Sequence, residues 1–408
     1  MDIQNTSKMK HGFVASIMMI FTLLYVFCYQ FNYPFTSTVF LYASFGCMLI
    51  YVTLTRFLKL GRQFYLLFLV ILVSWFGVAY TDNQEMGQRE GILLLVMLLY
   101  VLVLSQDDVL VRNMRKALFL CSFVVLAGVL IQFTVPDAFS SFMSPILRSD
   151  CYEQLMRSYN VDGAYAGFSA YTPDAAYFSS LIFGFSILNV LENRNNMSRL
   201  RKIILLILAF LSVFVVILTS KRGLIVAMLA AIALTVMIGK KKSPKTILAF
   251  GAIIVVGIFL VYYIASTNTT VDLFLRRFDV SESRDITTGR TDMWLGALET
   301  FGDTNPLIGK GTGATYTIED AGMHNIYLQI FYDHGIIGFL IYVVFLVYNL
   351  RKAIINNDSH SLFIQFVMLI YGISGNPIYS NSFFITYITY TVFNYQESYE
   401  LDAEGELS

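Results

Sequence analysis

Charged residues are scarce in this chain. They make up 14% of its 408 residues, whereas a soluble domain carries about a quarter. Positive and negative charges balance to a net charge of zero, so the composition gives no general attraction to nucleic acid. The four cysteines show neither metal-ligand spacing nor a disulfide framework. These shortages exclude an ordinary soluble domain, a basic nucleic-acid-binding surface and a cysteine-based site.

What the chain has in excess is apolar sequence, arranged in long blocks. Hydrophobic residues make up 56% of the chain, and the mean hydropathy is +0.63. Blocks of roughly 16–22 residues suit helices that cross a bilayer core of about 30 Å. We predict one all-α polytopic membrane domain over residues 1–408, with about twelve spans: Phe13–Phe31, Thr36–Thr55, Phe64–Tyr80, Gly91–Ser105, Ala117–Val135, Thr172–Leu191, Ile203–Thr219, Leu224–Gly239, Ile247–Ile264, Ile330–Leu350, Leu362–Ile378 and Phe383–Tyr395.

The positions of the lysines and arginines predict which gaps face the cytoplasm. With the N-terminus inside, the cytoplasmic gaps and the N-terminal tail hold 18 of the 28 lysines and arginines, in line with the positive-inside tendency. Both termini are then cytoplasmic, including a C-terminal tail over 396–408. The same topology leaves two long extracytoplasmic loops, 136–171 and 266–329, of which the second joins spans nine and ten.

Two cations lie between the seventh and eighth apolar runs, in "ILTSKRGLIVAM". The predicted topology puts Lys221 and Arg222 on the extracytoplasmic side, against the positive-inside tendency. One interpretation is that both side chains snorkel from a helix end to the surface. The other is a cationic pocket for an anionic headgroup.

The loop 266–329 contains a predicted amphipathic helix. Apolar residues at helical spacing place this helix over Arg290–Phe301, with Thr288 as its N-cap and Trp294 on its apolar face. If the helix lies on the membrane, Arg290 reaches headgroup depth. A solvated first-turn arginine is the alternative.

A glycine-rich turn and a histidine follow that helix. The glycines of "GKGTG", with Gly311 at the centre, form either a plain turn or a set of backbone amides that converge on an anion. His324, followed by Asn325, stands just before the tenth span. A neutral imidazole can accept a proton from a hydroxyl, although a capping or merely exposed histidine is the alternative. No Asp-x-Asp pair occurs in the extracytoplasmic loops, so neither a metal nor another cofactor is expected.

The order of these motifs resembles a known family. "TSKRG" at a span boundary, then "TGRTDMW", "NPLIGKGTG" and "HNIYLQIFYDHGIIG" in one outer loop, resemble the O-antigen polymerase and O-antigen ligase superfamily. The resemblance implies a membrane glycosyltransferase fold of the C type in the bacterial cytoplasmic (inner) membrane. It also implies transfer of a glycan from an undecaprenyl diphosphate carrier to an acceptor hydroxyl outside that membrane, without metal.

The resemblance implies roles for individual residues. Arg222 and Arg290 correspond to the arginines that hold the diphosphate, and His324 to the histidine that activates the acceptor, so these three are the expected catalytic residues. The position of Lys221 departs from the family pattern, in which a small polar residue is common there. The expected substrate-binding residues are Lys221, Asn325, Gly311, Trp294 and Arg277.

Several functions fit these motifs. We favour a polymerase of lipid-linked repeat units, because polymerases serve capsules and exopolysaccharides as well as O-antigen. An O-antigen ligase that moves finished glycan to lipid A core shares the same donor chemistry. A transporter or flippase is less favoured, since the spans contain few ionisable residues and the halves look unrelated; a scaffold is the last alternative. Expected partners are the undecaprenyl-diphosphate-linked glycan, the lipid bilayer, a chain-length regulator and a flippase, with no nucleic acid.

Overall fold

A computed structural model describes residues 3–28, 30–32, 37–55, 58–193, 197–238, 290–302, 305–317 and 322–392, with side chains from residue 12 onward. In these parts the chain is helical, and its one pairing of extended residues is an isolated bridge between Phe31 and Leu147. Several predictions fall outside the described residues: the ninth span Ile247–Ile264, the N-cap Thr288, Arg277 and the tail 396–408.

The described helices follow the predicted apolar runs. Each of the other eleven runs contains a helix. In chain order the helices are α1 (Ile3–Phe27), α2 (Ser37–Leu54), α3 (Arg62–Val78), α4 (Gln84–Leu104), α5 (Asp108–Thr134), α6 (Pro136–Met143), α7 (Ser149–Asp162), η1 (Gly167–Ser169), α8 (Thr172–Glu192), α9 (Arg199–Leu218), α10 (Arg222–Ile238), α13 (Arg290–Phe301), η2 (Ala314–Thr317), α14 (Ile326–Ile355), α15 (Ser359–Tyr371), η3 (Pro377–Tyr379) and α16 (Asn381–Thr391).

Six of these helices are long and apolar enough to cross a membrane: α2, α4, α5, α8, α9 and α14. Shorter apolar helices are the segment Gly12–Phe27, α3, α10 and α15. This helix set agrees with the predicted all-α polytopic membrane fold, while the number of twelve spans stays a prediction. The helix α16 covers 11 residues, about 16 Å at 1.5 Å per residue, which is shorter than a bilayer core.

Helix ends depart from the apolar runs where polar residues cap them. The side chain of Asn83 accepts a hydrogen bond from the Met86 amide at 3.2 Å, so α4 begins well before its apolar run. Asp107 caps α5 in the same way through the Val109 amide at 2.8 Å.

The C-terminal end of α15 differs from the prediction. The helix ends at Tyr371 rather than at the predicted Ile378. The prediction for this end was wrong, because the sequence "GISGN" forms a turn there.

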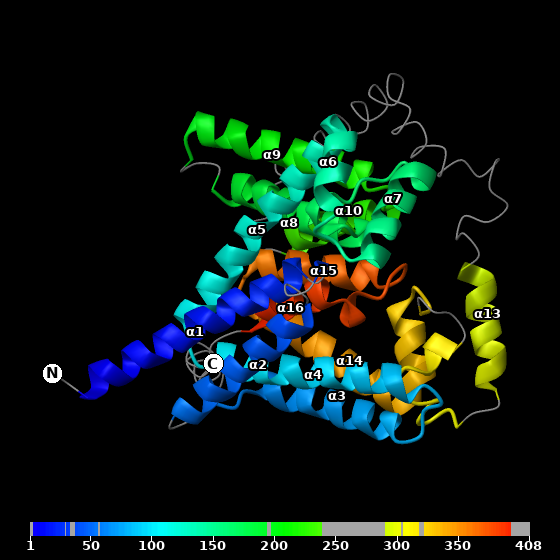
Figure 1. Ribbon diagram of the computed structural model, residues 1–408. Coiled ribbons are helices and arrows are strands. Elements are labelled where there is room, and N and C mark those ends of the chain that lie inside the picture. The colour runs from blue at the N-terminus through cyan, green and yellow to red at the C-terminus, as the bar shows by residue number, and fades with distance from the viewer. Residues whose placement is uncertain are drawn as a thin grey trace.

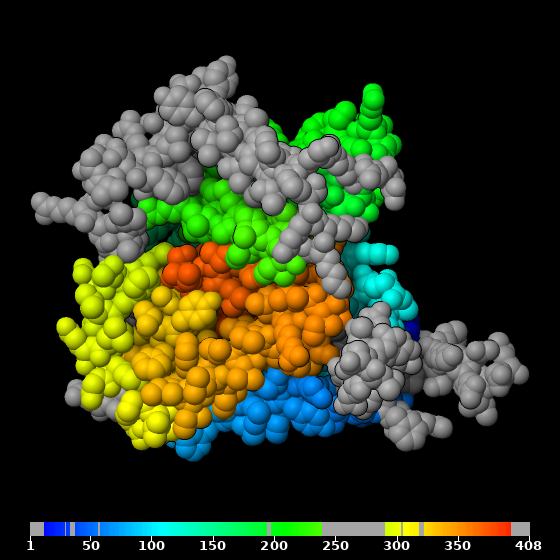
Figure 2. All heavy atoms as spheres, turned by 180° about the vertical axis from the view of Figure 1, so that it is seen from behind, coloured from blue at the N-terminus to red at the C-terminus, as the bar shows by residue number. Residues whose placement is uncertain are grey.

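The helices form two groups with a central pair between them. In Figure 1, α8, α9 and α10 lie above α15 and α16, while α2, α3, α4 and α14 lie below. Helices that pack closely against each other include α8 with α9, α10 with α15, and α14 with α3. Seen from behind, the C-terminal half of the chain reaches the surface between α10 and α3 (Figure 2). The helix α13 stands at one side of the molecule, near the start of α14.

The helix α14 is broken near its N-terminus. Gly335 has φ 62° and ψ −164°, a backbone conformation that only glycine adopts readily. The amides of Ile336 and Ile337 donate to the carbonyls of Pro306 and Leu307 at 2.9 and 3.1 Å. The loop after α13 therefore satisfies the backbone groups that the break sets free, and it is fixed to α14 by doing so.

The segment 136–171 folds into α6, α7 and η1. Its apolar side chains form a small cluster of their own: Phe139, Met143, Leu147, Leu155, Ala166 and Ala170. The side-chain oxygen of Gln132 accepts from the amides of Ala166 and Gly167 at 2.9 and 2.8 Å. The amide of Tyr165 donates to the carbonyl of Leu218 at 2.9 Å. This last contact ties the segment to the end of α9, immediately before Lys221.

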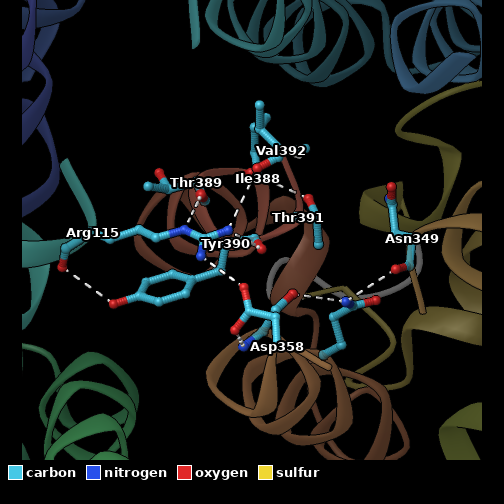
Figure 3. Close-up of polar contacts among 10 residues, drawn as sticks. Arg115, Asn349, Asp358, Ile388, Thr389, Tyr390, Thr391 and Val392 are labelled. Atoms are coloured by element: carbon cyan, nitrogen blue, oxygen red, sulfur yellow. Dashed lines mark hydrogen bonds and ion pairs between the residues drawn. The ribbon is translucent and has the colours of Figure 1, made fainter. Parts of the chain in front are cut away.

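The end of α16 is held by an arginine from α5 (Figure 3). The Arg115 guanidinium pairs with Asp358 at 2.7 Å and donates to the carbonyls of Thr389 and Tyr390 at 3.2 and 2.8 Å. It also lies 5.0 Å from the centre of the Tyr390 ring. The cation therefore satisfies C-terminal carbonyls of the helix, where the helix dipole favours positive charge.

Replacing Arg115 with alanine should destabilise the fold. The change removes the cation that pairs with Asp358 and the donor to the α16 carbonyls, and we expect a loss of roughly 2–3 kcal/mol. Thermal unfolding in detergent measures it, with Arg112→Ala, an exposed cation on the same helix, as the control. Equal melting temperatures for the two variants would contradict the assignment of Arg115 as the clamp.

Candidate functional site

Lys221 and Arg222 lie at the start of α10. The preceding Ser220 has a positive φ of 56°, which is strained for a residue other than glycine. Arg222 is the first residue of α10 and Lys221 precedes it. A cation at this helix end is repelled by the positive end of the dipole, whereas an anion is attracted to it. Strain and unfavourable charge at the same point indicate a function other than stability.

Two further helices begin beside these cations. Arg290 is the first residue of α13, which has the predicted bounds Arg290–Phe301. His324 precedes Asn325, the N-cap of α14, and has a φ of 49°. We use the name cationic cluster for four residues: Lys221, Arg222, Arg290 and His324. Three helix N-termini therefore contribute to one positively charged region.

The effects of these side chains on one another's pKa show that they lie close together. Burial, together with the positive charges of Arg290 and Lys221, lowers the pKa of His324 to about 4. Burial also lowers the pKa of Arg290, with Tyr371 opposing and Arg222 adding to the effect. Arg222, Lys221 and His324 thus all lie within electrostatic range of Arg290 or of one another. At neutral pH the imidazole is uncharged and able to accept a proton.

A short turn after α15 holds the cluster together. The Arg290 guanidinium donates to the carbonyl of Ser374 at 3.0 Å. The amide of Ile326, directly after the His324 loop, donates to the carbonyl of Gly372 at 2.8 Å. Gly223 on α10 packs so closely that an added Cβ would lie 2.5 Å from the Ser374 Oγ. The turn 371–376 therefore touches all three segments that carry the cluster.

Trp294 and Asn325 take part in building the site. The Trp294 indole N–H donates to the carbonyl of Met323 at 2.8 Å, which fixes α13 to the His324 loop. The Asn325 side chain accepts from the amides of Tyr327 and Leu328 at 3.1 and 3.2 Å, as a helix N-cap. Both polar groups hold His324 in place, and substrate contact by either residue stays a prediction.

The structure corrects the expected role of Gly311. The amides of Lys310 and Gly311 donate to the carbonyls of Tyr332 and Asp333 at 3.0 and 2.8 Å, so neither is turned toward a substrate. Gly311 has a φ of 98°, and a Cβ there would lie 2.6 Å from the Gly77 carbonyl oxygen. The Asp333 carboxyl accepts from the Thr315 amide at 3.0 Å. The group that accepts from an amide at this glycine-rich turn is thus the carboxyl of Asp333, part of the protein itself.

Sequence reasoning missed the turn 371–376. Its residues are uncharged, they were assigned to the end of an apolar run, and their contacts are with residues far away in the chain. The one available signal was the pair of glycines in "GISGN", which is unusual inside a span. Of the other predicted residues, Arg277 lies outside the described residues, so it stays a prediction.

Substituting Gly223 tests whether the turn positions the cluster. Gly223→Ala should push the turn away from α10 and lower activity roughly tenfold or more, because its Cβ meets the Ser374 Oγ. The double variant Gly223→Ala with Ser374→Ala removes that oxygen and should recover most of the rate. Gly296→Ala on α13 is the control, since an added Cβ there has no neighbour within 4 Å. Failure of the double variant to improve on the single one would contradict the contact.

A comparison with protein families decides the identity of this region. Residues 207–343 match the family model described as O-Antigen ligase. This part of the chain is therefore similar to the O-antigen ligase family. The match spans about a third of the chain, from α9 into α14, and contains all four residues of the cationic cluster. No curated protein matches the chain.

This family consists of membrane glycosyltransferases that ligate or polymerise glycans. The match confirms the resemblance seen in the sequence motifs. Together with the apolar helices it shows that the chain is a membrane protein.

Proposed function

We propose that the protein polymerises undecaprenyl-diphosphate-linked repeat units into a surface polysaccharide at the outer face of the cytoplasmic membrane. The observation that carries the proposal is the cationic cluster, in which Arg290 and Lys221 lie near a neutral histidine, Arg222 lies near Arg290, and three helices begin. That arrangement suits a substrate with a diphosphate and a hydroxyl at adjacent positions.

The chemistry follows from the positions of these groups. The acceptor hydroxyl oxygen attacks the anomeric carbon of the donor, the bond from that carbon to the diphosphate oxygen breaks, and the bonding pair leaves with the diphosphate. His324 accepts the hydroxyl proton, and Arg222, Arg290 and Lys221 stabilise the negative charge that develops on the leaving group. Attack from the side opposite the leaving group inverts the anomeric configuration. Fixed cations of this kind contribute several kcal/mol to such a step.

The matched family description favours a second function, ligation of finished glycan to lipid A core. The donor and its diphosphate are the same in both reactions, and only the acceptor differs. The cationic cluster serves either reaction equally well. A flippase is a third candidate, and it requires no base at His324.

A gel of lipid-linked and surface glycan from a strain that lacks the gene distinguishes these functions. A polymerase predicts single repeat units in the deletion strain and a ladder after complementation. A ligase predicts long chains that accumulate on the lipid carrier and are missing from the surface. Repeat units trapped on the cytoplasmic side would indicate a flippase and overturn the proposal.

A further inference from the structure

Two polar side chains are buried beside the His324 loop and form no hydrogen bond of good geometry with a described residue. Gln329, in the first turn of α14, is 0% exposed, and both atoms of its amide lack such a bond. Glu90, on α4, is 5% exposed, and both carboxyl oxygens lack one. Buried polar groups are normally satisfied in folded proteins, so these atoms are available to a bound ligand.

A tyrosine brings these two groups together. The Tyr316 hydroxyl lies within reach of a weak hydrogen bond to both Glu90 and Gln329, which leaves other atoms of these groups open, and burial, with Glu90 beside it, raises the pKa of Tyr316. Tyr316 itself is half-buried and the following Thr317 is exposed, so the group opens to the surface through η2. Glu90, Tyr316 and Gln329 are named here the Gln329 cluster.

The Gln329 cluster adjoins the catalytic histidine loop. A Cβ added to Gly322, two residues before His324, would lie 2.9 Å from the Gln329 Oε1 and 2.8 Å from the Asn376 Nδ2. The cluster comes from α4, η2 and α14, whereas the cations come from α10 and α13. In Figure 1, α4 and α10 lie on opposite sides of α15 and α16. The histidine loop therefore adjoins both the cations and a group of amide, phenol and carboxyl side chains.

The chemistry of the cluster suits a neutral, hydroxyl-rich ligand. Amide, phenol and carboxyl groups all form hydrogen bonds with hydroxyl groups, and together they match those of a sugar. A metal ion fits less well: the nearby Asp333 carboxyl is taken by the Thr315 amide and hydroxyl. The described residues also contain no group of three His, Cys, Asp or Glu side chains that could hold a metal.

We propose that the Gln329 cluster binds the acceptor sugar, on the opposite side of His324 from the diphosphate. This inference rests on the proposed glycosyl transfer, because that reaction must place an acceptor hydroxyl against His324. The unsatisfied amide and carboxyl groups are then completed by sugar hydroxyls when the acceptor is bound. Donor recognition stays with the cationic cluster.

Steady-state kinetics of the purified full-length protein test the inference. The donor is lipid-diphosphate-linked glycan extracted from the deletion strain, and the acceptor is the same glycan released from its lipid by mild acid. Gln329→Met, which keeps the side-chain length, should raise the acceptor KM roughly five- to tenfold and leave the donor KM within about twofold. Tyr316→Phe, at a half-buried ring, should also raise the acceptor KM. This variant replaces Gln329→Met in the test if Gln329→Met does not fold.

Gln365→Met is the matched control. Gln365 is also a buried amide on an apolar helix, 1% exposed, but it bonds to Asn349 and Ser361 instead of lying by the His324 loop. An unchanged acceptor KM in Gln329→Met and Tyr316→Phe would overturn the acceptor site while leaving glycosyl transfer standing. A donor KM that rises as much as the acceptor KM would also overturn it. Absence of any transfer by the wild-type protein would instead refute the proposed function, and the acceptor site with it.

Discussion

His324→Ala should abolish glycan transfer while the protein remains in the membrane at normal abundance. The imidazole is the one proton acceptor in the cationic cluster, and general-base catalysis contributes about 10²–10⁴ in rate. The alanine variant leaves the cap of α14 in place, because that cap is made by Asn325. Initial rates with lipid-linked glycan, together with the glycan ladder in the complemented strain, measure the loss.

His360→Ala is the control for that experiment. His360 is half-buried near the start of α15, against the Phe185 ring, and lies in a different part of the fold from the cluster. Its replacement should leave the rate close to that of the wild type. A normal ladder in the His324→Ala strain would refute His324 as the base, whichever acceptor the enzyme uses.

The pH dependence gives an independent check on the same residue. Burial, Arg290 and Lys221 all disfavour the imidazolium, which holds the pKa of His324 near 4 in the free protein. The basic form is therefore present down to that pH, and kcat/KM for the donor should fall only below it. A bound diphosphate offsets the two cations, so the acid limb of kcat should lie at higher pH than that of kcat/KM. An acid limb of kcat/KM near the ordinary histidine value of about 6.5 would contradict this environment.

Arg290→Ala should cause the second large loss, about 10²–10³ in kcat. One of its N–H groups is used on the Ser374 carbonyl, and the guanidinium has four more to offer. The residue therefore serves as both a support for the site and a ligand for the leaving diphosphate. Arg290→Lys keeps the charge but cannot span both partners, so we expect an intermediate rate.

The two substitutions together separate charge from geometry. If Arg290→Lys is as active as wild type, only the charge matters and the contact with Ser374 is dispensable. If Arg290→Ala retains the wild-type rate, Arg290 has no role at the diphosphate. Arg112→Ala, on the exposed face of α5, controls for the removal of a cation. Initial rates at saturating donor and acceptor measure all three variants.

The sequence predicted well those features that rest on local pattern. The bounds of α13 agree with the prediction because its apolar stripe is periodic. Met293, Trp294 and Phe301 from that stripe pack with Ala297 against α14, as a one-sided helix requires. The cations and His324 were found because charge and imidazole are rare in so apolar a chain.

Features that depend on distant contacts were not predictable in this way. The turn 371–376 meets Arg290 and Ile326 only in the folded protein. Gln329 is one polar residue near the start of a long apolar helix, and nothing in its neighbours shows that its amide lacks a partner. The role of Gly311 was misjudged because a glycine-rich sequence does not show whether its amides face a ligand or the protein.

The turn 371–376 has a consequence for engineering the enzyme. It supports α10, α13 and the His324 loop at once, so a change there displaces donor recognition and proton transfer in a single step. Mutagenesis libraries that seek enzyme variants active on other glycans should leave the residues of this turn unchanged. Variation is better directed to Tyr316 and its neighbours in η2, where one side of the reaction centre can change while the other keeps its alignment.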